Sequence, residues 1–207
     1  MSTRPYDSAL RTEQARHTRA RIVDAARRLL LEEGAPGLTI ARLAKSADVS
    51  TQTIYNAVGG KAAVIKAVYD VTLAGDDDPR PMNDRPEFRA LADAPDAAAM
   101  LRHYAALGRR IAERVGPLLT VLLANPDDDV RALAHTIDGE RLRGNDTTVR
   151  HLAERFRLPP GLTRARATDI VWALTAPELF DRLVRQRGWS ADDYERWLGD
   201  AMVGALV

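Results

Sequence analysis

Apolar positions along the chain recur every three or four residues, which is the repeat of a helix that buries one face. Between residues 12 and 33, for example, one face takes Ile22, Val23, Ala26, Leu29 and Leu30. Valine, isoleucine and threonine do not gather in the alternating runs that mark strands. The pattern therefore predicts an all-α protein of about nine helices.

Four of these helices are expected within residues 1–74. The first ends at Gly34, because glycine commonly follows the last residue of a helix. Thr39 can cap the second helix, and a turn at residues 47–49 separates it from a short third helix that Ser50 can cap. Two consecutive glycines end the third helix, and a fourth, connecting helix begins at Lys61.

The remaining chain divides into a connector and a larger helical domain. Residues 75–95 are rich in aspartate and proline and lack apolar periodicity, so we expect a loop or frayed connector there. Residues 96–207 predict a second domain, whose helices are separated by glycine and proline. The expected helices are 96–114, 117–124, 127–157, 163–187 and 190–206.

Charge is distributed unevenly between these parts. The formal net charge of the 207 residues is only +1, but residues 1–70 hold eleven lysines and arginines against seven acidic residues, a net of +4. The rest of the chain has a net charge of −3. A local excess of positive charge is expected where a protein meets a polyanion, so the N-terminal segment is the candidate for nucleic-acid binding.

The short third helix places polar side chains opposite its apolar face. Ile54 and Val58 are expected to face the core. The opposite face offers short hydroxyls and amides, from Ser50, Thr51, Gln52, Thr53 and Asn56. Amides can bond the edge of adenine in the major groove, and a threonine methyl can meet a thymine methyl. A helix, a turn and a helix of this kind indicate a helix-turn-helix DNA-binding domain.

Two segments of the N-terminal domain resemble a known family. TRARIVDAARRLLLEEG (residues 18–34) and GLTIARLAKSADVSTQTIYNAVGGKAAVIKAV (residues 37–68) resemble the DNA-binding domain of TetR-type, tetracycline-repressor-like, transcriptional regulators. Residues 168–203 resemble the C-terminal helices of many members. The resemblance implies that the third helix enters the major groove, that Tyr55 contacts the backbone and supports this helix, and that Lys61 binds phosphate.

The chain departs from the family pattern directly after Tyr55. The family usually has an aromatic residue, a histidine and a phenylalanine, where this chain has Asn56, Ala57 and Val58. Ala57 cannot donate a hydrogen bond to phosphate, whereas Val58 can still fill a core position. Asn56 can bond either a base or a phosphate, and both alternatives stay open. We expect weaker non-specific affinity or a shifted sequence preference.

The expected DNA-binding residues follow from the helix-turn-helix and the resemblance together. They are Thr39, Ser50, Thr51, Gln52, Thr53, Tyr55, Asn56 and Lys61. N-terminal arginines can supply further phosphate contacts, and these are Arg11, Arg16, Arg19 and Arg21.

The second domain has two expected roles, which the resemblance implies. The last two helices are amphipathic and would form a four-helix interface between two copies of the chain, which gives a homodimer suited to a pseudo-palindromic operator. A small apolar or amphipathic effector would bind in the same domain. The candidate lining is Met100, Tyr104, Leu107, Leu119, Leu122 and Trp172. The alternative is that these side chains form ordinary core.

Several other kinds of protein are not favoured. The absence of cysteine excludes disulfides and cysteine-based zinc sites. The four histidines are widely separated, and the glycines before Lys61 lack the rest of a phosphate-binding loop. We therefore expect no catalytic residues, no metal and no cofactor. No signal peptide or membrane-length apolar run is seen, which favours a cytoplasmic protein.

The sequence therefore predicts a homodimeric transcriptional regulator that binds double-stranded DNA, most simply a ligand-responsive repressor. The alternative is a helical protein-interaction module whose helix-turn-helix has degenerated, since the usual histidine and phenylalanine are missing.

Overall fold

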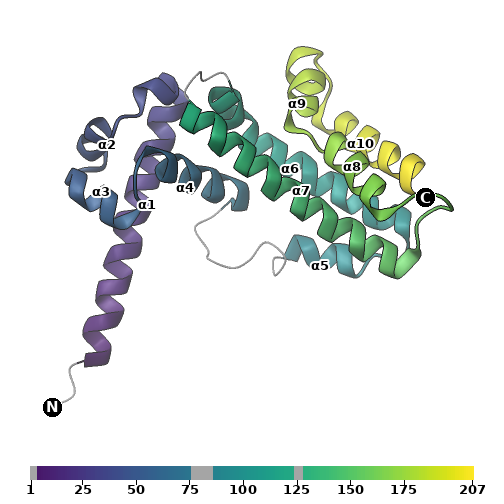
Figure 1. Cartoon of the computed structure of the whole chain (residues 1–207), viewed down its shortest axis with the longest axis horizontal. Coiled ribbons are helices and arrows are strands. Elements are labelled where there is room, and N and C mark those ends of the chain that lie inside the picture. Colours follow the sequence, from purple (N-terminus) through teal and green to yellow (C-terminus); the bar gives the residue numbers. More distant parts are fainter. Residues whose placement is uncertain (1–3, 76–85, 124–127) are drawn as a thin grey trace. The chain divides into compact units, whose positions relative to one another are not determined.

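The computed structural model describes residues 4–75, 86–123 and 128–207. Every regular element in these ranges is a helix, which confirms the predicted all-α class (Figure 1). None of the helices so described is long and apolar enough to cross a membrane. The chain forms two compact units, and each is described separately below. The first comprises Met1–Asp77 and Thr120–Leu133, and the second comprises Asp78–Leu119 and Ala134–Val207.

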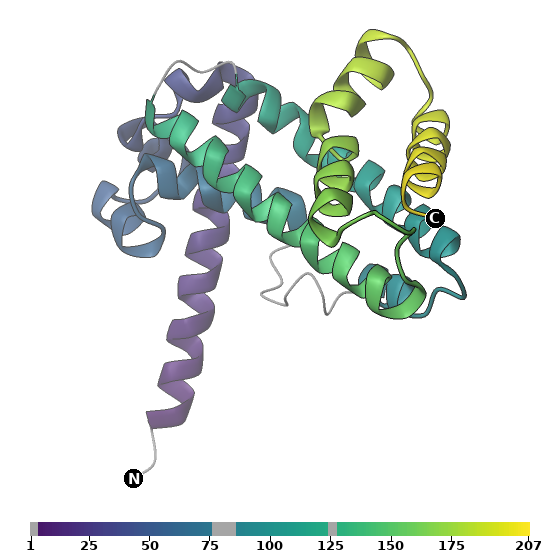
Figure 2. The same ribbon diagram turned by 45° about the vertical axis from the view of Figure 1, so that its right-hand side comes forward.

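The N-terminal unit contains the four expected helices. They are α1 (Arg4–Gly37), α2 (Ile40–Ala47), α3 (Thr51–Ala57) and α4 (Lys61–Ala74). Helical geometry in α1 is interrupted at Gly34, whose φ of 73° lies in the left-handed region that glycine enters without strain. The predicted stop at Gly34 is therefore confirmed. The N-terminal half of α1 extends beyond the other three helices, and residues 12–17 are exposed (Figures 1 and 2).

A compact core joins the four helices. The second half of α1 packs against α2, α3 and α4, and α2 also contacts α3. Each helix contributes at least one fully buried aliphatic side chain, and examples are Ile22, Leu30, Leu43, Ile54 and Ile65. Because a helix as short as α3 is marginal on its own, this packing is what keeps it helical.

The second unit contains two long helices and several shorter ones. They are α5 (Pro86–Ala92), α6 (Ala97–Leu123), α7 (Asp128–Phe156), α8 (Arg164–Leu174), α9 (Pro177–Phe180), the π-helical segment η2 (Asp181–Gln186) and α10 (Ala191–Leu206). The last residues of α6 and the first of α7 belong to the N-terminal unit. Helices α8 and α10 pack against each other (Figure 2).

The expected break at Gly116-Pro117 is wrong, because α6 continues through both residues. A proline inside a helix removes one hydrogen bond but does not by itself end the helix when tertiary contacts hold both sides. Here the missing side chain of Gly116 leaves room for Arg185, since a Cβ at Gly116 would lie 3.1 Å from a terminal guanidinium nitrogen.

Two further boundaries differ from expectation. The predicted helix 163–187 is interrupted at Ala176, whose backbone is extended because the next residue is Pro177. The expected connector 75–95 includes helix α5. This helix was not predicted, because the connector lacks apolar periodicity. The expected break at Asn125-Pro126 and residues 76–85 lie outside the described residues.

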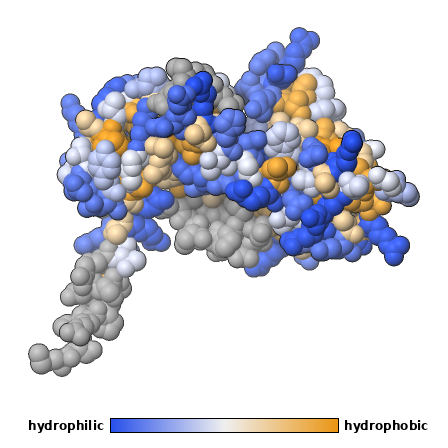
Figure 3. Space-filling view, viewed as in Figure 1, coloured by the Kyte–Doolittle hydropathy of each residue, from blue (hydrophilic) through white to orange (hydrophobic). Residues whose placement is uncertain are grey.

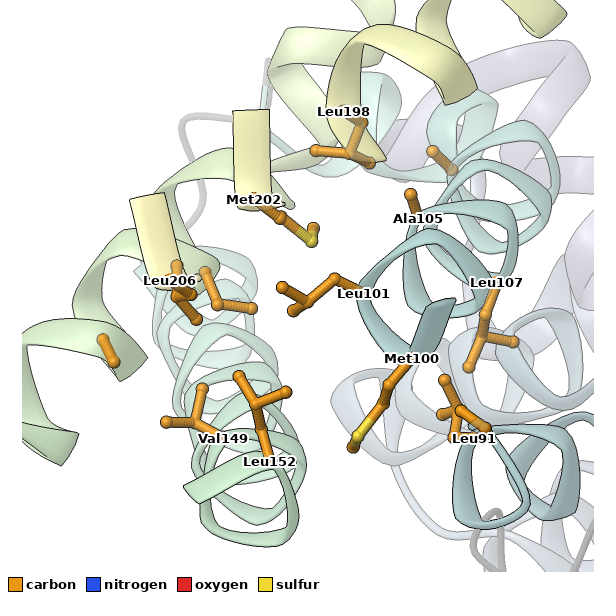
Figure 4. Close-up of a cluster of buried hydrophobic side chains, with 14 of the residues drawn as sticks. Leu91, Met100, Leu101, Ala105, Leu107, Val149, Leu152, Leu198, Met202 and Leu206 are labelled. Carbon is orange, nitrogen blue, oxygen red and sulfur yellow. The ribbon is translucent and has the colours of Figure 1, made fainter. Parts of the chain in front are cut away.

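Aliphatic side chains from α5, α6, α7 and α10 form the core of the second unit (Figure 4). Leu101 of α6 lies among Met202 and Leu206 of α10 and Val149 and Leu152 of α7. Helix α10 approaches α6 closely at Gly199, where a Cβ would lie 3.2 Å from Cγ of Arg102. The sequence pattern thus produces a core in which α10 is an integral member.

Replacing Leu198, which is fully buried in this core, should destabilise the second unit. Leu198→Ala removes buried methyl groups and leaves a cavity, so the free energy of unfolding should fall by about 2–5 kcal/mol. Chemical denaturation followed by circular dichroism measures the change. Val207→Ala is the control, because Val207 is exposed and should lose little. Equal stability of the two variants would contradict this assignment of the core.

Candidate nucleic-acid interface

The connection between α2 and α3 is a tight turn with a cap on each side. Asp48 ends α2 in the left-handed conformation with φ of 51°, which aspartate tolerates better than most residues. Ser50 caps the start of α3, and its Oγ accepts a hydrogen bond from the backbone N–H of Thr53 over 3.0 Å. Thr39 caps α2 in the same way, accepting from the N–H of Arg42 over 3.2 Å. Local sequence therefore defines the helix-turn-helix.

Arg21 of α1 holds this turn in place. Its Nη2 donates hydrogen bonds to the carbonyl oxygens of Ala47, over 2.6 Å, and Asp48, over 3.1 Å. The same nitrogen lies 3.7 Å from the Asp48 carboxylate. A cation at the C-terminus of a helix also interacts favourably with the helix dipole. Arg21 was expected to contact phosphate, but its guanidinium is directed at the turn.

Helix α3 has one buried face and one polar, exposed face. Ile54 is fully buried, which fixes the rotation of the helix about its axis. The exposed residues are Thr51, Gln52, Tyr55 and Asn56, and the Tyr55 side chain remains 54% exposed. The amides of Gln52 and Asn56 are joined by a hydrogen bond from Nε2 to Oδ1 over 2.9 Å. The structure thus brings four of the expected residues together on one accessible surface.

The other expected residues are helix caps, partly buried, or on neighbouring helices. Thr53 is half-buried, and its hydroxyl lies 2.8 Å from that of Ser50. Thr39 is exposed at the start of α2, and Lys61 is half-buried at the start of α4. Val58, which was expected in the core with Ile54, is only half-buried. The three hydroxyl residues therefore serve first as helix caps or cap partners.

The N-terminal arginines differ in their surroundings. Arg16 is exposed on the projecting part of α1, whereas Arg19 is half-buried. The side chain of Arg11 lies outside the described part of the chain. Within the helix-turn-helix, Arg42 is paired with Glu33 across the α1–α2 junction. Arg16 is therefore the candidate among the described N-terminal arginines for contact with an anion.

Six residues were expected to line an effector site in the second domain. Met100 and Leu107 are buried in the aliphatic core, and Leu119 is buried further along α6. Leu122 belongs to the N-terminal unit. Only Tyr104 and Trp172 of the six make side-chain hydrogen bonds to polar side chains within the described second unit.

A polar network connects these two aromatic residues inside the second unit. The Tyr104 hydroxyl donates to Oδ1 of Asn145 over 2.6 Å, and Asn145 donates to Oγ1 of Thr175 over 3.3 Å. Arg141 donates to the same Thr175 oxygen over 3.4 Å. Burial raises the pKa of Tyr104, against a smaller lowering by a hydrogen bond with Thr148. The hydroxyl is therefore neutral at physiological pH.

The guanidinium of Arg141 also organises the surroundings of Trp172. It lies 4.9 Å from the centre of the indole ring and donates to the Trp172 carbonyl over 2.5 Å. Asp138 accepts hydrogen bonds from Arg141 and from Nε1 of Trp172. Sequence reasoning missed Asp138, Arg141 and Asn145, although their spacing of three and four residues places them along one face of a single helix.

Loss of the Arg21 contacts should loosen the helix-turn-helix. Arg21→Ala removes two hydrogen bonds to carbonyls at a partly exposed site, so the free energy of unfolding should fall by about 1 kcal/mol. Arg21→Lys should restore part of the loss, because a single ammonium can reach one carbonyl. Thermal or chemical denaturation measures both variants. Arg16→Ala is the matched control, and an equal effect of the two alanine variants would argue against the contact.

Comparison with known proteins places these features in a family. Residues 22–68 match the family model described as bacterial regulatory proteins, tetR family. No curated protein sequence is detectably similar to the chain. The match covers the second half of α1, both helices of the helix-turn-helix and the first half of α4.

Solved structures share the fold over nearly the whole chain. NalD of Pseudomonas aeruginosa, the secondary repressor of the MexAB-OprM multidrug efflux pump, is 21% identical, with 94% of this chain and 98% of NalD covered and a TM-score of 0.65. MexZ of the same organism, a repressor responsible for antibiotic resistance, is 22% identical (91% and 94% covered, TM-score 0.61).

A third structure is the fatty acid degradation regulator FadR from Bacillus halodurans, which is 15% identical, with 90% of this chain and 95% of FadR covered and a TM-score of 0.69. At these identities the neighbours establish a common fold, and the family match establishes the DNA-binding domain. Residues 22–68 thus carry the DNA-binding domain of bacterial regulatory proteins of the tetR family, and the chain shares its fold with NalD and MexZ.

Proposed function

We propose that this regulator is a cytoplasmic repressor that binds a pseudo-palindromic operator as a homodimer and acts by binding alone, without catalysis. The observation that supports this most directly is the exposed polar face of α3, held in a fixed rotation by buried Ile54. The N-terminal unit would bind DNA, and residues 96–207 would dimerise and respond to an effector. NalD and MexZ, which share the fold, are both described as repressors.

Helix α3 would lie in the major groove with its exposed face toward the bases. Hydroxyl and amide groups on this face can donate and accept hydrogen bonds at base edges. Thr51 and Gln52 would contact bases, Asn56 would act from the same face, and Tyr55 would reach the DNA backbone at the edge of the groove. Ser50 and Thr53 would combine their capping role with contacts from the start of the helix.

Phosphate contacts would flank the groove on both sides of α3. Thr39 caps the start of α2, and Lys61 is the first residue of α4. Arg16 lies on the projecting part of α1, which can reach further along the duplex. Cations that neutralise phosphates release counterions, so affinity should depend steeply on salt. A modest local excess of positive charge would be sufficient for binding phosphate, because the two N-terminal units of a dimer would contact the duplex together.

Selection from a randomised duplex library tests operator binding. Wild type should enrich an inverted repeat, and Tyr55→Ala should reduce affinity for that repeat about 10-fold, within the range expected for one specific contact. Arg16→Ala should lower the slope of log affinity against log salt by about one. Leu142→Ala in the second unit is the control, because Leu142 is also exposed and should not touch DNA.

An absence of enrichment in the library would contradict the proposed function. Binding that is insensitive to both salt and Tyr55→Ala would do the same, and the interaction-module alternative would then be favoured. Enrichment of a single, non-repeated site would contradict the homodimer while leaving DNA recognition intact.

The last helices offer an apolar surface for dimerisation. Several apolar side chains there remain partly exposed although they pack on the core, and these are Ile170, Leu174, Leu179, Leu183, Val184, Trp197 and Val203. Figure 3 shows hydrophobic residues at the surface around α8, α9 and α10. Burial of such a surface against a second copy is the usual source of dimer stability.

A charge on this surface should prevent dimerisation. Val203 on α10 is half-buried, so Val203→Glu should leave the protomer folded but place a desolvated carboxylate in the interface. Analytical ultracentrifugation should show a monomer, and affinity for the inverted repeat should fall. Leu142→Glu on α7 is the matched control, since it adds the same charge outside the last helices. Dimerisation of both variants would exclude this interface.

The effector would bind in the second unit beside Tyr104 and Trp172. Support comes from the polar network that joins these aromatic residues within an otherwise apolar interior. A small amphipathic molecule needs that combination of apolar lining and a few placed polar groups. Such a molecule can regulate only if it binds one state of the dimer better than another. Release of labelled operator by candidate compounds would measure this response.

A further inference from the structure

The hydrogen bond between Gln52 and Asn56 lies on the exposed face of α3, one helical turn apart. Nε2 of Gln52 donates to Oδ1 of Asn56 over 2.9 Å. Both residues are exposed, so the bond does not serve to satisfy a buried group. It fixes the relative orientation of two amides at the surface that would face DNA. Asn56 also stands at the first position where this chain departs from the family pattern.

The bond is compatible with a complete base-binding edge on Gln52. A primary amide has two N–H donors and one oxygen that accepts. One N–H lies on the same edge as Oε1, and the other points away from it. When the N–H that points away serves Asn56, the edge formed by Oε1 and the remaining N–H stays available. Neither amide can flip by 180° without the other. If Gln52 flipped, its oxygen would face the oxygen of Asn56, and if Asn56 flipped, two N–H groups would face each other.

This edge is complementary to one base in the major groove. Adenine presents N7 as an acceptor and the N6 amino group as a donor, side by side. Gln52 can accept from N6 through Oε1 and donate to N7 through Nε2. Guanine presents two acceptors at the same place, and so it would leave Oε1 opposite an acceptor. An oriented glutamine at this position therefore discriminates between the two purines.

We propose that Gln52 binds the edge of an adenine in each operator half-site, and that Asn56 is a positioning residue that holds the Gln52 amide in the orientation required. This rests on the proposed function, in which α3 lies in the major groove. Asn56 thus acts on sequence preference through Gln52 rather than through a phosphate. A glutamine side chain that is oriented before binding also loses less rotational freedom on contact with the base.

Base preferences of matched variants test the assignment. In competition binding with the selected operator, wild type should prefer adenine at one position of each half-site by about 5- to 150-fold over other bases. Gln52→Ala should abolish the preference at that position alone. Asn56→Ala should reduce the same preference several-fold, and the double variant should resemble Gln52→Ala.

Conservative variants separate positioning from direct contact. Asn56→Asp keeps an acceptor for Nε2 of Gln52, so the adenine preference should survive even though the added carboxylate weakens overall affinity. Gln52→Glu should shift the preference toward cytosine, whose N4 amino group donates to a carboxylate. Thermal unfolding of each variant provides the folding control, and little change is expected because both residues are exposed.

Two results would overturn the inference alone. The first is an Asn56→Ala variant that weakens binding equally for all bases, with a lower salt dependence, because that indicates a phosphate contact. The second is an inverted repeat in which no position responds to Gln52→Ala. A wild-type protein that selects no sequence at all would instead contradict the proposed function, and the assignment of Gln52 with it.

Discussion

The DNA-binding unit depends on how the short helix α3 is held. Seven residues are too few for a stable helix in water, because nucleation is unfavourable and few hydrogen bonds follow it. Two tertiary contacts supply what the helix lacks. Ile54 anchors it in the core of α1, α2 and α4, and Arg21 ties the preceding turn to α1. The polar face of α3 remains exposed because Ile54, on the opposite face, makes the contact with the core.

The sequence predicted this unit well because its signals are local. Gly34, Thr39 and Ser50 act within a few residues of their own position, and the structure has the helix stop and both caps where they were expected. Arg21 was expected at phosphate because it is one of the N-terminal basic residues. Its contacts with the backbone carbonyls of Ala47 and Asp48 were not predicted, because a sequence gives no sign of an arginine that bonds backbone so far along the chain.

The second unit was harder to predict because its decisive contacts are distant in sequence. Gly116 was read as a helix breaker, but the space it leaves is occupied by Arg185, some seventy residues later. The aromatic candidates Tyr104 and Trp172 were chosen by type, whereas their link through Arg141, Asn145 and Thr175 needs three helices to be assembled. Periodicity identified the helices there but not the polar network within them.

The composition of the exposed face of α3 has a consequence for how selectivity varies with conditions. Thr51, Gln52, Tyr55 and Asn56 are hydroxyl or amide residues, and none of them is a lysine, arginine, aspartate or glutamate. In the proposed complex, the ions released on binding would therefore come mainly from phosphate contacts, which every duplex offers. Total affinity would then vary strongly with ionic strength, while the base contacts that distinguish one site from another would depend on it much less. A regulator of this kind would keep its choice of site across a range of osmotic conditions, even as the fraction of time it spends on DNA changes.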